Sequence, residues 1–210
     1  MASVSLAQIS GGTMKIASEA LATLRARVRG AVLTAGDEGY DTARTVWNAM
    51  VDRSPGLIVS CARPADVQAT VDFARNTGAV LSVRGGGHNI AGSAVCEGGV
   101  MIDLTPMKSV QIDAAARTAR VEPGVTLAEF DREAQAFGLV TPTGINSTTG
   151  IAGLTLGGGF GWTTRKFGLT IDNLLSADVV TADGRLKRAS AKENPDLFWA
   201  LRAGAAISAW

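Results

Sequence analysis

The sequence predicts an α+β fold with mixed strand pairing, on three observations. An apolar run at 56–61, an amphipathic helical pattern and a second apolar run at 79–83 make one strand–helix–strand unit. Short strand patterns follow this unit, and a hairpin pattern lies near the C-terminus. Because helices and strands do not alternate regularly, neither a repeating βαβ ladder nor an internal repeat is predicted.

Two helices are predicted in the N-terminal part. The first spans residues 16–29, where apolar residues recur at roughly helical spacing and Gly30 ends the pattern. The second runs from Ala65 to Asn76, between the two apolar strands. Pro64 suits its first turn and Gly78 its end, because Pro is common at helix starts and Gly just past helix ends.

The C-terminal part continues with strands, a helix, a hairpin and a last helix. Its three short strands are predicted at 100–104, 109–113 and 118–122. Thr126 and Glu129 match a capping box for a helix that ends near Gly138. Asp183-Gly184 marks the turn of a hairpin within 174–190. Pro195 then opens the closing helix.

Composition limits the class of protein. The chain has 210 residues, 46% hydrophobic and 19% charged, enough for one large or two small domains with a sizeable core. A net charge of +1 and 5% aromatic residues argue against nucleic-acid binding. No apolar run reaches the roughly 20 residues that span a bilayer, and the first residues do not support a secretory signal. We therefore expect a cytoplasmic protein without membrane, nucleic-acid or metal partners.

Glycine is the anomaly of this composition. Of 25 glycines, six lie in residues 85–99 and eight in residues 144–168. Both windows also carry large apolar residues, unlike the polar Gly/Ser linkers. They indicate backbone packed against a large flat ligand. The only histidine, His88, directly follows three consecutive glycines.

The common nucleotide motifs do not fit these windows. A Walker motif needs a Lys followed by Ser or Thr after its glycines, and neither window has it. Gly157 and Gly159 begin a dinucleotide fingerprint, but Trp162 stands where its third glycine belongs. What remains is a pair of loops whose N–H groups can bind a pyrophosphate, together with one imidazole.

Three ordered motifs carry a family resemblance. These are "SVRGGGHNIAGSAVCEGGVMIDLTPMKSVQID", "TTGIAGLTLGGGFGWTTRKFGLTIDNLLSADVVTADG" and "NPDLFWALR". From about Gly36 to Arg202 the chain resembles FAD-linked oxidases of the berberine bridge enzyme type. The resemblance implies a p-cresol methylhydroxylase-type FAD-binding domain, made of two small α+β subdomains with the cofactor between them. It assigns 1–35 to a leader and helix and 36–210 to the FAD-binding domain, with a core at about 53–202.

The resemblance also implies the cofactor-binding residues. His88 matches the histidine bonded through a ring nitrogen to the 8α-methyl group of FAD. The residues implied to bind the cofactor are Arg84, Gly85, Gly86, Gly87, His88, Asn89, Thr148, Thr149, Gly150, Gly153, Gly157, Gly158, Gly159 and Gly161. Asp172 and Asn173 match a recurring pair, for which turn formation and cofactor contact both stay open.

Two positions depart from many family members. Asn146 stands where those members carry a cysteine that attaches the flavin a second time, so one covalent bond is expected. Leu154 stands where they carry a histidine near the flavin. Cys96 does not match the attachment position, and we expect it and Cys61 to be ordinary buried thiols.

Two functions from different classes follow. The first is an FAD-dependent oxidoreductase that takes a hydride from an alcohol, sugar or amine C–H onto flavin N5 and is reoxidised by dioxygen. The second is a truncated FAD-binding remnant without turnover, because the family pattern stops after Arg202. The substrate domain is expected to be absent, so no catalytic residue is named. The substrate and the choice between oxidase and dehydrogenase stay open. A structural module without cofactor would leave both glycine windows unexplained.

Overall fold

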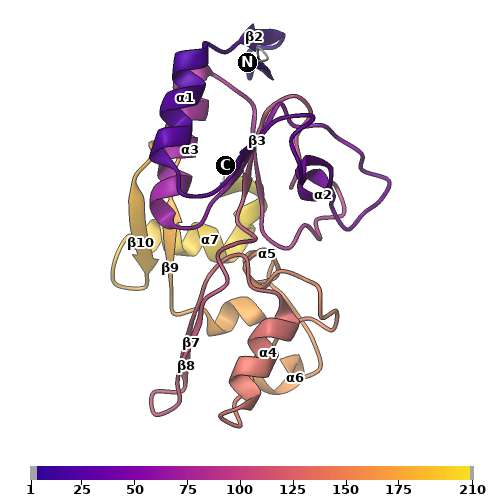
Figure 1. The fold of residues 1–210 in the computed structure, drawn as a ribbon. Coiled ribbons are helices and arrows are strands. Elements are labelled where there is room, and N and C mark those ends of the chain that lie inside the picture. The colour runs from indigo at the N-terminus through magenta and orange to yellow at the C-terminus, as the bar shows by residue number, and fades with distance from the viewer. Residues whose placement is uncertain (1–3, 209–210) are drawn as a thin grey trace. The chain divides into compact units, whose positions relative to one another are not determined.

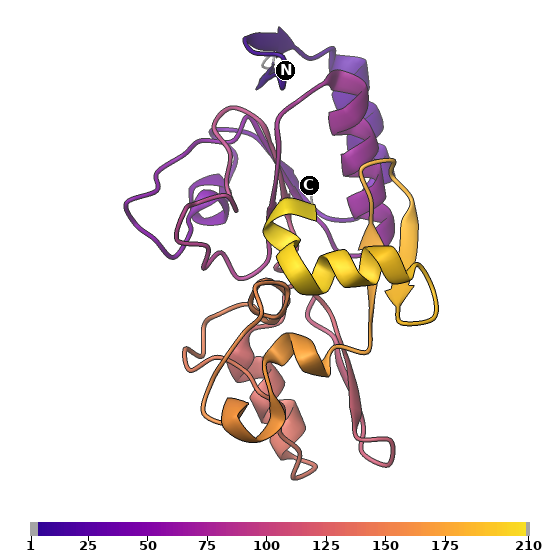
Figure 2. The same cartoon turned by 180° about the vertical axis from the view of Figure 1, so that it is seen from behind.

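The computed structural model describes residues 4–208, and the side chains of residues 4–202. The chain divides into two compact units. Unit 1 comprises Met1–Pro106 and Ala182–Gly184, and unit 2 comprises Met107–Thr181 and Arg185–Trp210. Both units contain helices and strands (Figures 1 and 2), so the predicted α+β class is confirmed.

Unit 1 is built on a four-stranded sheet. Its elements are β1 (Ser5–Ala7), β2 (Thr13–Lys15), α1 (Ser18–Arg27), β3 (Val32–Leu33), α2 (Tyr40–Arg44), β4 (Leu57–Ser60), α3 (Pro64–Thr77), β5 (Leu81–Arg84) and β6 (Val100–Asp103). The sheet order is β3-β4-β6-β5, with β4, β6 and β5 parallel and β3 antiparallel to β4. The two predicted strands that flank α3 are therefore separated by β6.

The two faces of this sheet are covered by different segments. Ile58 and Met101 pack with Tyr40, Val46 and Val95 on one face. Their neighbours along β4 and β6 point to the opposite face, because side chains alternate along a strand. Figure 1 shows α1 and α3 side by side on one side of the sheet and α2 on the other. The central strands β4 and β6 are thus buried, and the edge strand β5 leads into the loop that carries His88.

Helix α3 begins and ends where the sequence predicts. Pro64 occupies the first turn and Gly78 the C-cap. One buried residue of the helix is a carboxylate, since Asp66 is 0% exposed. Its oxygens accept hydrogen bonds from the Ala62 and Arg29 N–H groups and from the Arg63 side chain. The helix therefore anchors the loops beside it through a polar contact that apolar periodicity does not reveal.

Unit 2 contains two antiparallel hairpins and several short helices. Its elements are β7 (Val110–Asp113), β8 (Thr118–Val121), α4 (Leu127–Gln135), α5 (Ile151–Leu156), α6 (Thr164–Phe167), the 3-10 helix η1 (Thr170–Asn173), β9 (Ser176–Val180), β10 (Leu186–Ser190) and α7 (Pro195–Ser208). The predicted capping box is confirmed, with the Thr126 N–H 2.7 Å from Glu129 Oε2. The predicted turn at Asp183-Gly184 joins β9 to β10.

Unit 2 has two apolar clusters. The first contains Val125, Leu127, Phe130 and Ile151, and the inner faces of β7 and β8 pack against it. The second joins Ala189 of β10 to Phe198 and Leu201 of α7. Because Ile151 belongs to α5, the first cluster fixes the start of that helix.

Several elements are absent from the sequence predictions. In unit 1 these are β1, β2, β3 and α2, and in unit 2 they are α5, α6 and η1. Strand β1 is firmly held, since Leu6 is 0% exposed and the Ala7 N–H donates to the Gly98 carbonyl. The domain boundary at residue 35 stays a prediction, although the structure pairs β3, before it, with β4, after it.

Candidate functional site

The predicted site residues fall into two sets, one in each unit. The first is the His88 loop (residues 84–89), which begins at the last residue of β5 in unit 1. The second is the second glycine segment (residues 148–161), which surrounds α5 in unit 2.

The His88 loop is tied to the segment at 45–48, which sequence reasoning missed. The Trp47 N–H donates to the Gly87 carbonyl at 3.0 Å. The Asn48 side chain donates to the Ile90 carbonyl at 2.9 Å. Gly87 has a φ of +70°, a conformation that glycine adopts at little cost. These contacts fix the path of the loop from both of its sides.

Arg84 holds the start of the loop through protein contacts. Its Nη2 lies 3.1 Å from Asp103 Oδ1, and its Nη1 donates to the Thr45 carbonyl at 2.9 Å. The two charged side chains are 11% and 4% exposed. Asp103 also accepts from the Thr105 hydroxyl at 2.9 Å. Arg84 thus links the ends of β5 and β6 to the 45–48 segment, and its predicted contact with a cofactor stays a prediction.

The His88 imidazole is half-buried and stacked on an indole. The ring centroids of His88 and Trp47 are 5.2 Å apart, with 22° between the planes. Burial lowers the pKa of His88 below its usual range. The imidazole is therefore neutral at neutral pH, and a neutral ring nitrogen can act as a nucleophile. No local spacing pattern marks Trp47, which lies 41 residues before His88 in the sequence.

Asn89 shapes the turn after the histidine. Its side-chain oxygen accepts hydrogen bonds from the Ser93 N–H at 3.1 Å and from the Ser93 hydroxyl at 2.9 Å. The Gly92 N–H donates to the Asn89 carbonyl at 3.1 Å. Asn89 is exposed, and its backbone N–H follows that of His88 along the same loop. The asparagine therefore has a turn-forming role, and its predicted cofactor contact stays a prediction.

The second glycine segment starts with a side-chain turn. Asn146 Oδ1 accepts from the Thr148 N–H at 3.1 Å and from its hydroxyl at 2.9 Å. The Leu127 N–H, at the start of α4, donates to the Thr149 carbonyl at 2.9 Å. Gly150 then bridges to Thr126 and serves as the N-cap of α5. Backbone hydrogen bonds thus attach the segment to the start of α4 before its glycine-rich part begins.

The glycines of this segment have two different physical reasons. A Cβ at Gly159 would collide with the Thr170 side chain, and one at Gly161 would collide with the Thr143 carbonyl. A Cβ at Gly153 or Gly158 would meet nothing within 4 Å. Close packing therefore accounts for Gly159 and Gly161, and a φ of +98° accounts for Gly158, so that of these positions only Gly153 has neither reason.

Gly153 is the position at which neither packing nor backbone conformation requires a glycine. It lies inside α5, where glycine is less stable than alanine by roughly 0.5–1 kcal/mol. At Gly157, the C-cap of α5, a Cβ would lie 3.3 Å from the Gly153 carbonyl oxygen. A bare helix surface with free space above it can accept a flat group against its backbone. The structure therefore leaves space beside this backbone, and the predicted cofactor contact of the segment stays a prediction.

Residues 172 and 173 form a turn. The Leu169 N–H donates to Asp172 Oδ2 at 2.9 Å. The Asn173 side-chain amide donates to the carbonyls of Phe167 and Leu169 at 3.1 and 2.9 Å. Of the two roles left open by the sequence, these contacts support turn formation.

Both cysteines are buried thiols, as predicted. Burial raises the pKa of Cys61 to about 12, and burial also raises the pKa of Cys96. Thiols of this kind are poor nucleophiles because the thiolate is the reactive form. The half-buried imidazole of His88 is therefore the better attachment group for a cofactor.

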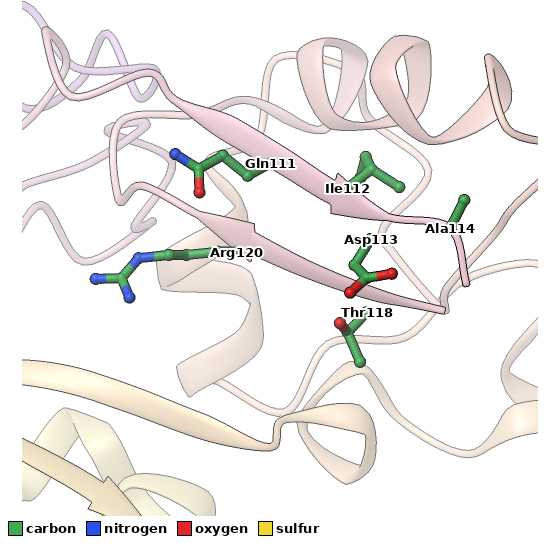
Figure 3. A pocket seen from close by; sticks show the side chains of 6 residues that line it. All are labelled: Gln111, Ile112, Asp113, Ala114, Thr118 and Arg120. Carbon is green, nitrogen blue, oxygen red and sulfur yellow. The ribbon is translucent and has the colours of Figure 1, made fainter. Parts of the chain in front are cut away.

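Unit 2 also has a hollow that is formed by other residues. It runs along the β7–β8 hairpin and is lined by Gln111, Ile112, Asp113, Ala114, Thr118 and Arg120 (Figure 3). It contains no residue of either predicted set. Among the described residues, no group of three or more His, Cys, Asp or Glu side chains is arranged to hold a metal ion. The helices of residues 4–208 include none with the length and apolar character of a membrane span.

Comparison with known proteins gives the same cofactor class. Residues 55–190 match the family model described as FAD binding domain. The chain is 41% identical over 175 residues to (R)-6-hydroxynicotine oxidase of Paenarthrobacter nicotinovorans, covering 83% of this chain and 38% of that protein.

Solved structures agree with this match. The structure of Physcomitrella patens BBE-like 1 has a TM-score of 0.82 at 34% identity, covering 87% of this chain and 40% of that one. The carbohydrate oxidase from Microdochium nivale has a TM-score of 0.82 at 30% identity, covering 89% and 40%. This chain spans about two fifths of the length of these relatives. It belongs to the family of FAD-linked oxidases of the berberine bridge enzyme type and has their p-cresol methylhydroxylase-type FAD-binding fold.

Proposed function

We propose that this chain is the FAD-binding part of an oxidoreductase and that it holds FAD covalently on His88. The observation that carries the proposal is the imidazole itself. It is the only histidine of the chain, it stacks on Trp47, and burial lowers its pKa so that it is neutral at neutral pH. A neutral nitrogen at the end of a clamped loop suits bond formation to an electron-poor carbon.

Bond formation between His88 and FAD removes two hydrogen atoms. An N–C bond replaces one N–H of His88 and one C–H of the 8α-methyl group of FAD. The two electrons and two protons released go to dioxygen, which becomes hydrogen peroxide. Because Asn146 stands where some relatives have a second attachment residue, one covalent bond per chain is expected.

The other predicted residues have supporting roles in this proposal. The N–H groups of Gly85, Gly86 and Asn89 bind the pyrophosphate, as oriented backbone amides do. The surface of α5 around Gly153, which carries no side chain, would lie against the isoalloxazine. The role of α5 is supported by the open space that the protein leaves at Gly153.

When bound, FAD supplies two-electron chemistry by accepting a hydride at N5. We propose that the substrate is a small alcohol, sugar or amine, since relatives are named for oxidation of 6-hydroxynicotine and of carbohydrate. Dioxygen is the proposed electron acceptor of the whole enzyme. No side chain of this chain is assigned as the catalytic base. A cytoplasmic location stays a prediction.

The second candidate is an FAD-binding piece with no turnover of its own. The chain spans only 38–40% of the relatives it matches. Hydride transfer needs a substrate held near N5, and groups on both sides of the flavin supply that geometry. Peroxide release from the 210-residue chain with sugars, alcohols and amines separates the two candidates. Turnover at or above about 1 s⁻¹ supports the enzyme, because that is the low end of ordinary rates.

The attachment itself is tested by acid precipitation and peptide mapping of the purified chain. The expected result is yellow protein that keeps its flavin in the acid pellet, on one peptide that contains His88. The H88A variant should release all of its flavin on acid treatment. Flavin released by acid from the unaltered chain, or found on Cys96, would contradict the proposal.

A further inference from the structure

Trp47 has an unusual environment for a large apolar side chain. It is 58% exposed, yet its main chain and ring are both held in place. The backbone N–H bonds to the Gly87 carbonyl, and the ring lies against His88 at 5.2 Å between centroids. Indole rings are usually buried or placed at interfaces. The stack on His88 is therefore the contact that distinguishes this residue.

Hydrogen bonds on both sides of the stacked rings join the two segments that carry them. Arg84 bonds to the Thr45 carbonyl at 2.9 Å, and the Asn48 side chain bonds to the Ile90 carbonyl at 2.9 Å. Segment 45–48 and the His88 loop are thus joined before, at and after the stacked pair. These bonds hold the two backbone segments from which the Trp47 and His88 rings project, and the stack itself is the contact between the rings.

The orientation of an imidazole decides what its nitrogen can reach. A new N–C bond forms in the plane of the ring, along the direction of the nitrogen lone pair. A neighbour stacked on the face of the ring fixes that plane and contacts the face rather than the edge that carries the nitrogens. An angle of 22° between the rings is close to parallel and has this effect.

We infer that Trp47 is a positioning residue for covalent flavin attachment, acting through the face of His88. This inference rests on the proposed function. The assisted step is replacement of one imidazole N–H and one methyl C–H by an N–C bond, with dioxygen as the two-electron oxidant. Trp47 takes no part in the electron transfer; it holds the plane of the nucleophile.

The test uses the 210-residue chain purified without flavin from cells starved of riboflavin. FAD is added in air, and acid-stable flavin is followed with time, while FAD affinity is measured separately at early times. W47A should attach flavin roughly 10- to 100-fold more slowly, because small misplacement of a reacting group has effects of this size. Its FAD affinity and thermal unfolding should be unchanged. W47F, which keeps a stacking ring, should restore the rate.

Trp199 provides the matched control. It is a 71% exposed tryptophan on α7, outside both predicted sets. W199A should attach flavin at the rate of the unaltered chain. A second readout needs no flavin: the ring protons of the one histidine should be shifted upfield in NMR spectra by the stacked indole. That shift should disappear in W47A and persist in W199A.

The possible failures are distinguishable. An unchanged attachment rate in W47A would overturn the role of Trp47 while leaving covalent attachment intact. Equal losses of FAD affinity and attachment rate in W47A would show a general binding role and would also overturn it. If the unaltered chain forms no acid-stable flavin, the proposed function fails and the inference fails with it.

Discussion

The His88 loop and the second glycine segment are both glycine-rich, but different forces hold them. In the His88 loop, side chains hold the backbone: Arg84 bridges Asp103 and Thr45, and Trp47 covers the imidazole. In the second segment, backbone pairing to α4 and close packing hold the chain, and part of its surface is bare. The His88 loop carries a reactive imidazole, whereas part of the second glycine segment exposes backbone that carries no side chain. Glycine content alone does not distinguish these two uses.

The largest expected effect is loss of the ion pair that holds the His88 loop. R84M should lower the free energy of unfolding by about 3–5 kcal/mol, because it leaves the Asp103 carboxylate buried and unpaired. Denaturant unfolding measures this change. R120M is the matched control, since the Arg120–Asp178 pair is largely exposed and such pairs contribute about 0–1 kcal/mol. Equal effects of the two variants would show that side chains do not hold the loop.

In the second segment, the largest effect is expected at a packed glycine. G161A should lower the free energy of unfolding by about 1–3 kcal/mol, because the new methyl group collides with the Thr143 carbonyl. Thermal and denaturant unfolding of the flavin-free chain measure the loss. An unchanged stability would mean that Gly161 is not required for packing.

Gly153 should respond in the opposite direction. G153A should stabilise the flavin-free chain by roughly 0.5–1 kcal/mol, because alanine is the better helix former and its methyl group enters open space. The same change should weaken FAD affinity, since the methyl group occupies the space proposed for the isoalloxazine. Unfolding and FAD titration are measured on the same preparation. Greater stability with unchanged FAD affinity would remove α5 from the proposed site.

The smallest expected effect is a pH dependence that only the His88 loop has. Residues 148–161 contain no titratable side chain, whereas burial lowers the pKa of His88. Between that lowered pKa and 6.5, the unfolded chain binds more protons than the folded chain, so stability rises with pH. In H88N this part of the pH profile should flatten. Identical profiles for the two proteins between pH 5 and 7 would show that folding does not perturb the imidazole.

Elements with strong local patterns could be predicted from the sequence. Pro64 and Gly78 mark the ends of α3, Thr126 with Glu129 marks the start of α4, and Asp183-Gly184 marks the β9–β10 turn. Each is decided by backbone chemistry within a few residues, which sequence spacing records directly. The motifs around His88 identified the FAD-linked oxidase family by resemblance, and the family match confirms it.

Other elements depend on distant partners. Helix α5 has only six residues and contains Gly153, a poor helix former, so local sequence does not predict it; Ile151 in the apolar cluster and the Thr126–Gly150 bridge hold it in place. Strand β6 was predicted, but nothing local indicates that it lies between β4 and β5.

By itself, then, the sequence determined the α+β class, the main helix and hairpin boundaries, and the family to which the single histidine and its glycines point. Only the tertiary structure decided that Arg84 is held by Asp103, that Trp47 lies on His88, and which glycines are needed for packing. The reason is physical: caps and turns are local, so their residues are close in sequence. Stacking, buried ion pairs and steric space depend on segments that folding brings together from positions up to tens of residues apart.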